Sequence, residues 1–281
     1  NNASPLVRQL VRESAAYRKL RQQGEEEDAA LKRLLDDKAF MKSLREDKTR
    51  IEAGFVAIDP RNSAVLAWVG SRDYARDAFD HVQQARRQPG STFKPFVYGA
   101  ALQRGAKPED TRKDEEVEIT LPGGEVWRPT DAVAPTGEPI TLSDALAYSK
   151  NTITAELMQE TGTERVIRLA RALGVKSSPL DAVPALALGA SPVTLLEMVN
   201  AYGSLANAGR YTPPQLVTRI ESSTGEVLAE FKPPKPQQAW DEKDNHELIE
   251  MLRAVIDKGT GRAIRRQYGI RADVAGKTGT T

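Results

Sequence analysis

The chain has 281 residues and nearly balanced charge, with 40 lysines and arginines against 39 aspartates and glutamates. It contains no cysteine, which excludes disulfides, thiolate zinc sites and a cysteine nucleophile, and we expect neither a metal nor a cofactor. The net charge of +1 gives no reason to expect a nucleic acid or an anionic membrane surface as a partner. This composition fits an ordinary globular protein of one large domain or two small ones.

Residues 1–50 are strongly charged, and their apolar residues keep a rough helical spacing on either side of Gly24, which predicts two helices. We interpret this segment as a helical linker or packing segment, with partner binding as an alternative. No stretch resembles a transmembrane helix, because the longest uncharged run, residues 182–196, contains two prolines and is shorter than the roughly 20 residues that a span requires. No signal peptide opens the chain, so we expect any membrane anchor to lie outside it.

The remaining residues, 51–281, are predicted to form one domain that begins with a β-hairpin. Residues 51–58 and 64–70 are apolar and partly β-branched, which is typical of strands. The residues between them, 59–62, are Asp, Pro, Arg and Asn, which favour a turn. The pattern therefore indicates two antiparallel strands at the start of this domain.

Helices are expected after this hairpin. The first should begin at Ser91 or Thr92, and Gly105 should end it. Residues 111–133 suggest another hairpin or an extended loop, with a Pro-Gly-Gly turn at 122–124. The later elements are expected as four helices within 141–209, the last of them at 192–206, then a hairpin of 216–222 with 225–231, a helix at 244–257 and a strand at 272–281. Strands at both ends with helices between them predict an α/β (α+β) fold with an inserted all-helical subdomain.

Three short motifs follow one another along this domain. They are Ser91-Thr-Phe-Lys94, Ser149-Lys-Asn151 and Lys277-Thr-Gly279. Each of them is weak when taken alone, because such spacings occur by chance in many chains of this size. In this order, and in these expected contexts, they resemble the motif set of penicillin-binding proteins and class A β-lactamases.

The first motif predicts a serine nucleophile that is activated by lysine. Ser91 and Lys94 are three residues apart and share one face of the expected helix. A serine hydroxyl needs a base to take its proton, and a neutral Lys94 can do so if burial and the charge of Lys277 lower its pKa. The two histidines, His81 and His246, lie in charged stretches and are interpreted as surface residues.

The helix that carries this motif should begin at the nucleophile. Pro95 is tolerated in the first turn of a helix, which leaves the backbone N–H of Ser91 available to stabilise an oxyanion. The simpler alternative is that Ser91 caps the helix and Lys94 faces solvent. Ser149 and Asn151 lie between two expected helices, where a hydroxyl can relay a proton and an amide can hold a substrate, although helix capping is again the simpler interpretation.

The third motif lies on an expected apolar strand. A strand beside the nucleophile can pair its backbone with an extended peptide substrate. Lys277, Thr278 and Thr280 can bind a carboxylate, and Gly279 lets a substrate backbone approach closely. An edge strand with polar side chains and no catalytic role is the alternative.

From Ile51 to Thr281 the chain resembles the transpeptidase domain of class A penicillin-binding proteins, the bifunctional type of high molecular weight. The segments that carry the resemblance are 87–102, 141–152, 186–209, 259–263 and 275–281. The resemblance implies a β-lactamase/transpeptidase-like fold in which helices flank a central antiparallel sheet. It also implies a bacterial, extracytoplasmic (periplasmic or outer-face) enzyme of cell wall biogenesis and cell shape.

The implied reaction is peptidoglycan cross-linking through a serine acyl-enzyme. A D-Ala-D-Ala stem-peptide donor would acylate Ser91 and release D-alanine, and the amine of a second stem peptide would then attack. β-Lactams would acylate Ser91 as substrate mimics. The resemblance implies that Lys94 is the acylation base and Ser149 a proton shuttle. It implies that Asn151 binds the substrate amide, that Lys277 and Thr278 bind the carboxylate or transfer a proton, and that Gly279 allows close substrate approach. The N–H groups of Ser91 and Thr280 would form the oxyanion hole.

The chain departs from this family in two respects. The glycosyltransferase domain typical of the class is absent here, so it is expected, if present, elsewhere in the full-length protein. The family's fold also continues beyond the third motif, so the polypeptide is expected to be longer. A β-lactam sensor and a serine β-lactamase are the alternatives; the glutamate motif E-x-x-L-N of class A β-lactamases is not found after Ser149, where residues 197–200 read EMVN.

Overall fold

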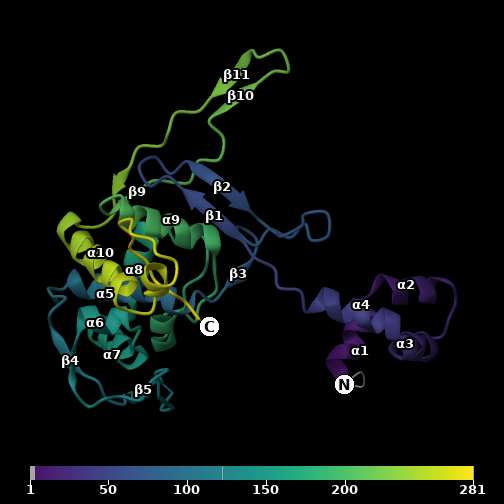
Figure 1. Cartoon of the computed structure of the whole chain (residues 1–281), viewed down its shortest axis with the longest axis horizontal. Coiled ribbons are helices and arrows are strands. Elements are labelled where there is room, and N and C mark those ends of the chain that lie inside the picture. Colours follow the sequence, from purple (N-terminus) through teal and green to yellow (C-terminus); the bar gives the residue numbers. More distant parts are fainter. Residues whose placement is uncertain (1–3, 122, 281) are drawn as a thin grey trace. The chain divides into compact units, whose positions relative to one another are not determined.

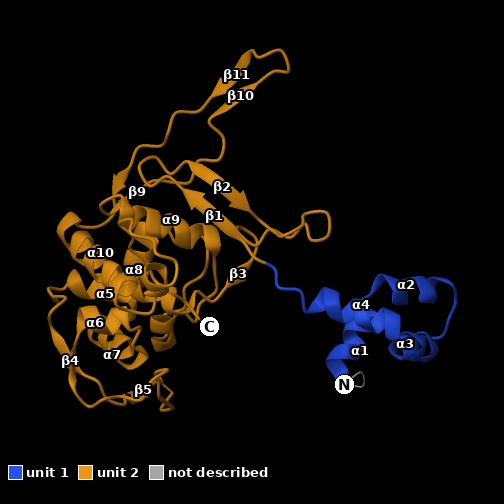
Figure 2. Ribbon diagram, viewed as in Figure 1, with its two compact units in different colours: residues 1–52 blue, residues 53–281 orange. Residues whose placement is uncertain are grey.

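The computed structural model describes residues 4–121 and 123–280, so Pro122 of the predicted Pro-Gly-Gly turn and the terminal Thr281 lie outside the described residues. The chain divides into two compact units, residues 1–52 and 53–281 (Figure 2). None of the described helices combines the length and the apolar character that crossing a membrane requires.

The first unit consists of helices α1 to α4, which pack around a small apolar core of their own (Figure 1). The sequence predicted two helices here, but the described residues form four, because Ser14 and Asp37 accept backbone N–H groups and begin new helices on either side of Gly24. The helices are α1 Pro5–Arg12, α2 Ala15–Gln22, α3 Glu27–Asp36 and α4 Lys38–Lys48. The core residues are Val11, Tyr17, Ala30, Leu31 and Leu34.

The second unit begins with the predicted hairpin. Strand β1 Phe55–Ile58 pairs antiparallel with β2 Val65–Val69, and Val56 lies opposite Trp68. Helix α9 Leu195–Ala206 packs against β1 of this two-stranded antiparallel sheet (Figure 1).

Helices supply more of the regular structure of the second unit than strands do, and the mixed α/β fold with an all-helical subdomain is confirmed. At the centre lies α5 Lys94–Leu102, in which every residue is buried. It packs against α6, α7, α8 and α10, since a helix that is apolar on all sides belongs in an interior. The other helices are α6 Leu142–Ala147, α7 Asn151–Thr161, α8 Thr163–Leu173, α10 Glu242–Asp257, α11 Ala263–Arg266 and the short 3₁₀ helices η1 Gly90–Phe93 and η2 Pro184–Leu188.

Short antiparallel strand pairs connect these helices. The pair β5–β6 and the protruding pair β10–β11 confirm two predicted hairpins (Figure 1). The pairs are β3 Arg86–Arg87 with β8 Val193–Thr194, β4 Thr111–Lys113 with β7 Pro139–Thr141, β5 Ile119–Thr120 with β6 Val126–Trp127, β9 Arg210–Tyr211 with β12 Gln237–Gln238, and β10 Arg219–Glu221 with β11 Val227–Glu230.

Two predicted elements need correction. The helix expected at 192–206 begins at Leu195, because Thr194 and Glu197 form a capping box that starts it there. The strand expected at 272–281 is not formed among the described residues. A strand requires a hydrogen-bonded neighbouring strand. In this segment the backbone N–H of Gly276 donates instead to the carbonyl of Leu252 in helix α10.

Candidate active site

The first motif lies at the buried start of α5. Ser91 belongs to the 3₁₀ helix η1, which continues directly into α5, and Pro95 stands in the first turn as the sequence predicted. Gly90 has a φ of 54°, a left-handed conformation that favours glycine. A β-carbon at Gly189 would lie 2.3 Å from the carbonyl oxygen of Gly90, so the end of η2 holds the nucleophile turn by direct backbone contact.

Lys94 is fully buried, and its amine faces the second motif. The Nζ atom lies 2.7 Å from the Ser149 carbonyl oxygen and 2.6 Å from Asn151 Oδ1, with Ser149 Oγ at 3.3 Å. Burial first, and then the positive charge of Lys277, lower the pKa of Lys94 from 10.5 to about 7, while the carboxylate of Asp131 opposes the shift. The lysine is therefore half neutral near pH 7, which is the state that a general base requires.

The second motif projects from the end of α6. The helix closes with a Schellman pattern, in which Ser149 N–H donates to Leu146 and Lys150 N–H donates to Ala145. This pattern places Ser149 at the left-handed position, with a φ of 60°, where glycine is the usual residue. A serine held there is strained, and such strain collects at functional sites. The turn aims the Ser149 hydroxyl at the two lysines of the other motifs.

The third motif closes the site from the C-terminal segment. Lys277 Nζ donates to Ser149 Oγ at 2.8 Å, and burial lowers the pKa of Lys277 to about 8. The hydroxyls of Thr278 and Thr260 lie 2.6 Å apart. A β-carbon at Gly279 would lie 2.7 Å from Thr92 Cγ2, so this backbone contacts the nucleophile turn itself.

These residues meet at one cavity of about 880 Å³. All three motifs contribute to its wall, and Lys94 and Lys277, which are not among the lining residues, both contact the Ser149 hydroxyl. The backbone N–H of Lys94 donates to the Ser91 carbonyl, whereas no hydrogen bond joins the described side-chain atoms Ser91 Oγ and Lys94 Nζ. The lining residues from the three motifs are Ser91, Ser149, Lys150, Asn151, Thr278 and Thr280.

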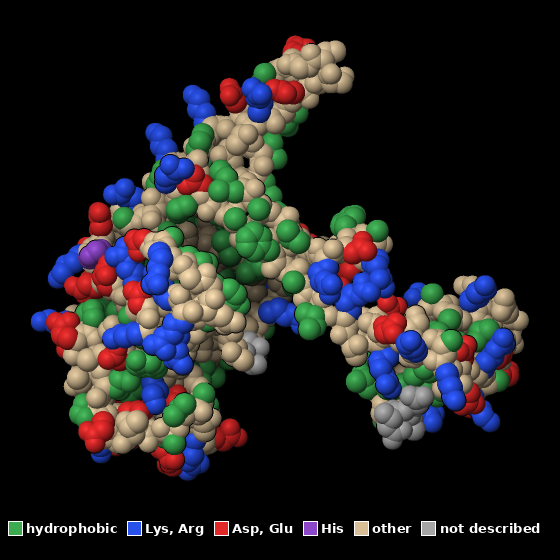
Figure 3. Space-filling model, viewed as in Figure 1, with side chains coloured by type: hydrophobic (Ala, Val, Ile, Leu, Met, Phe, Trp, Pro, Cys, Tyr) green, Lys and Arg blue, Asp and Glu red, His purple; other side chains and the backbone are tan. Residues whose placement is uncertain are grey.

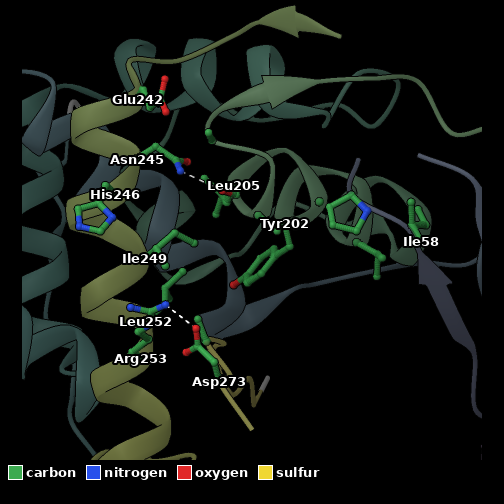
Figure 4. A pocket seen from close by; sticks show the side chains of 16 residues that line it. Ile58, Tyr202, Leu205, Glu242, Asn245, His246, Ile249, Leu252, Arg253 and Asp273 are labelled. Atoms are coloured by element: carbon green, nitrogen blue, oxygen red, sulfur yellow. Dashed lines mark hydrogen bonds and ion pairs between the residues drawn. The ribbon is translucent and has the colours of Figure 1, made fainter. Parts of the chain in front are cut away.

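A second hollow, of about 600 Å³, lies among β1, α9, α10 and residues 273–275 (Figure 4). The space-filling view shows hydrophobic side chains gathered around a hollow in the second unit (Figure 3). In Figure 4, Arg253 pairs with Asp273 at 2.6 Å and Asn245 donates to the Leu205 carbonyl. No serine, threonine or lysine is among the residues that line this hollow, so it offers no hydroxyl–amine pair. His246 lines it, whereas His81 pairs with Asp77.

The sequence analysis missed polar residues that support the second motif. Asp114 and Asp131 lie within residues 111–133, a segment interpreted only as a hairpin or an extended loop, and both flank Lys150. Thr260 was also missed. No periodic pattern marks these positions. Asp114 stands in the charged run 112–116 and Asp131 follows Pro129 and Thr130, and such patterns normally indicate only a surface loop.

Comparison with known proteins gives matches for the second unit. The profile of the penicillin binding protein transpeptidase domain matches residues 53–281. The chain is 39% identical over 240 residues to penicillin-binding protein 2D of Bacillus subtilis, covering 82% of this chain and 34% of that protein. It is 34% identical over 239 residues to penicillin-binding protein 1A of Neisseria cinerea, covering 82% of this chain and 29% of that protein. The chain thus spans about a third of the length of these curated relatives.

Solved structures agree with this placement. Penicillin-binding protein 1A from Haemophilus influenzae superposes with a TM-score of 0.76 at 27% identity, over 82% of this chain and 40% of that one. The D,D-transpeptidase domain of a peptidoglycan glycosyltransferase from Eggerthella lenta has the same fold, with a TM-score of 0.70 at 24% identity, over 84% of this chain and 67% of that one.

Proposed function

Because this chain belongs to the penicillin-binding protein transpeptidase family, we propose that it is a peptidoglycan D,D-transpeptidase that works through an acyl-enzyme on Ser91. The donor is a stem peptide ending in D-Ala-D-Ala, and the acceptor is an amine of a second stem peptide. The observation that carries the proposal is the convergence of three motifs on one cavity, with a buried lysine of lowered pKa behind the nucleophile turn.

Acylation begins when neutral Lys94 takes the proton of the Ser91 hydroxyl. Ser91 Oγ then attacks the carbonyl between the two D-alanines, and the carbonyl becomes a tetrahedral oxyanion. Backbone N–H groups of Ser91 and Thr280 stabilise that charge. Collapse breaks the C–N bond, and the leaving D-alanine amine needs one proton, which passes from Lys94 through Ser149 Oγ. The hydroxyl of Ser149 lies 3.3 Å from Lys94 Nζ, within reach for such a relay.

The remaining motif residues bind the substrate. Lys277 and Thr278 hold the terminal carboxylate of the donor, and Gly279 lets the peptide backbone approach the third motif. Asn151 binds the N–H of the substrate amide through Oδ1, which accepts from Lys94 Nζ and has a second lone pair for the substrate. The partly lowered pKa of Lys277, about 8, leaves it mostly protonated at neutral pH and therefore able to attract an anion.

Deacylation completes the transfer. The neutral acceptor amine attacks the ester carbonyl, a new amide bond forms, and the Ser91–acyl bond breaks, returning the proton to Ser91 Oγ. A β-lactam undergoes the first half in the same way, but its ring opens without losing a leaving group. The opened ring stays attached and blocks the acceptor, which inhibits the enzyme. Neither step requires a metal or an organic cofactor.

This chemistry assigns a place in the cell as well. Its substrate lies outside the cytoplasmic membrane of a bacterium, so the unit at residues 53–281 acts there, and cross-linking contributes to cell wall biogenesis and cell shape. Residues 1–50 serve as a helical linker or packing segment beside the catalytic domain in the sequence.

A peptide-transfer assay tests the function. A donor stem pentapeptide and an amine acceptor are incubated with the protein, and released D-alanine and cross-linked product are measured by mass spectrometry. Both should appear with wild type and be absent in Ser91→Ala. Binding of a labelled penicillin without any peptide transfer would contradict the proposal and favour a sensor. Rapid loss of the label after a chase would favour a β-lactamase.

A further inference from the structure

The strongest unassigned feature of the site is a buried carboxylate opposite the second motif. Asp131 comes from the loop between β6 and β7, and its side chain is 4% exposed. One oxygen accepts from the backbone N–H of Asn151, and the other accepts from the hydroxyl of Thr152 at 2.9 Å. None of the three motifs includes this residue.

Asp131 supplies a cap that helix α7 lacks within its own sequence. The N-cap residue of α7 is Lys150, whose side chain makes no capping hydrogen bond. Exposed backbone N–H groups at a helix start favour a negative charge, and a carboxylate from another segment satisfies them equally well. The carboxylate of Asp131 therefore fixes the start of α7, where the Asn151 side chain emerges.

The same loop also orients the Asn151 amide. Asn151 Nδ2 donates to the carbonyl of Thr130 at 2.6 Å, the residue next to Asp131. Because the amide nitrogen is committed to that carbonyl, Oδ1 points the other way and accepts from Lys94 Nζ at 2.6 Å. Two consecutive loop residues therefore hold Asn151: Asp131 accepts from its backbone N–H, and Thr130 accepts from its side-chain amide.

A second acidic residue keeps the loop in place. Lys150 Nζ lies 2.8 Å from Asp114 and 3.9 Å from Asp131, and the side chains of Lys150 and both aspartates are nearly buried. Asp114 also accepts from the N–H and hydroxyl of Thr136. Lys150 thus pairs closely with Asp114 and only distantly with Asp131, so the carboxylate of Asp131 stays available to the start of α7.

We infer that Asp131 is a positioning residue of the reaction, which sets the place of the Lys94 amine through Asn151 and acts on its protonation through its own charge. The inference rests on the proposed function, because it concerns how that function's base is prepared. The charges acting on Lys94 are Lys277, which disfavours its protonated form, and Asp131, which favours it. Tyr98, one turn along α5, is buried with its hydroxyl near Thr154.

Two variants separate charge from shape. Asp131→Asn keeps an acceptor for the helix start but removes the negative charge, whereas Asp131→Ala removes both. Glu118→Gln is the matched control, because Glu118 lies in the same segment and makes an exposed pair with Arg128. The rate constant for acylation by a fluorescent penicillin is measured from pH 5.5 to 9.5, together with the thermal unfolding midpoint.

Asp131→Ala should acylate about 10- to 100-fold more slowly, which is less than the roughly 10²–10⁴-fold that proton transfer contributes, because the base is displaced and not removed. The acylation rate should rise with pH as Lys94 loses its proton, and this rise is the acidic limb of the pH profile. Asp131→Asn should move the midpoint of the acidic limb to lower pH, because removing a negative charge disfavours the protonated amine of Lys94. Glu118→Gln should match wild type.

Three outcomes are decisive for the inference. An unmoved midpoint in Asp131→Asn, with rates of both variants within about twofold of wild type, would overturn it. A loss of thermal stability together with a uniform fall in rate at every pH would also overturn it, by showing a structural role alone. If wild type itself forms no adduct, the proposed function fails first, and the two failures are distinguishable.

Discussion

Acylation should follow a narrow pH window set by the buried Lys94 and the half-buried Lys277. With a pKa of about 7, half of Lys94 is neutral at pH 7, whereas a lysine at 10.5 would be neutral in only about 3 molecules in 10,000. The shift therefore raises the population of active base by about a thousandfold at this pH. The rate should rise through about pH 7 as Lys94 loses its proton, and fall above about pH 8 as Lys277 loses the charge that attracts the carboxylate.

The assay is the second-order rate constant for a fluorescent penicillin, measured at constant ionic strength from pH 5.5 to 9.5. The two limbs report values of the coupled pair, because each lysine feels the other. Lys277→Gln should move the acidic limb to higher pH, since the positive charge that lowers the pKa of Lys94 is gone. It should also remove the alkaline fall. A rate that keeps rising tenfold per pH unit to pH 9.5 would refute a lysine base of lowered pKa.

Two further changes test the packing and the charge of the site. Gly189→Ala should abolish penicillin labelling and destabilise the fold by more than about 2 kcal/mol in denaturant unfolding, because its β-carbon would meet the Gly90 carbonyl. The control is Gly137→Ala, which has a similar φ but open space around the new β-carbon, and it should cost only about 1 kcal/mol and keep labelling. Equal losses of stability and labelling in the two variants would contradict this reasoning. Asn151→Asp should raise the pKa of Lys94 by placing a carboxylate beside its amine. Its acidic limb should then appear at higher pH, and an unmoved limb would show that residue 151 does not face the amine.

The meeting of the three motifs could be predicted because the spacing of their residues and the chemistry of their side chains agree. Three residues separate Ser91 from Lys94, so both lie within one helical turn, and Pro95 limits where that helix can begin. The burial of Lys94 followed from its need to be neutral. The hairpin at the start of the domain followed from two apolar segments around a turn.

Other features depend on contacts between distant segments, which local patterns do not encode. Asp131 caps a helix that begins twenty residues later in the chain, so no short motif includes both partners. The strand expected at 272–281 has suitable residues, but pairing requires a neighbour as well as a propensity. Ser149 occupies the left-handed position after a helix, where glycine is usual. A rule that places helix ends at glycine therefore does not predict that α6 ends here.

The central claim is that Ser91 is the one hydroxyl made reactive by this site. It is tested most directly by intact mass spectrometry of the protein before and after a β-lactam, followed by peptide mapping of the adduct. We predict a single added β-lactam mass on the peptide that contains Ser91, and none in Ser91→Ala. An adduct on another residue, or one that persists in Ser91→Ala, would contradict the account.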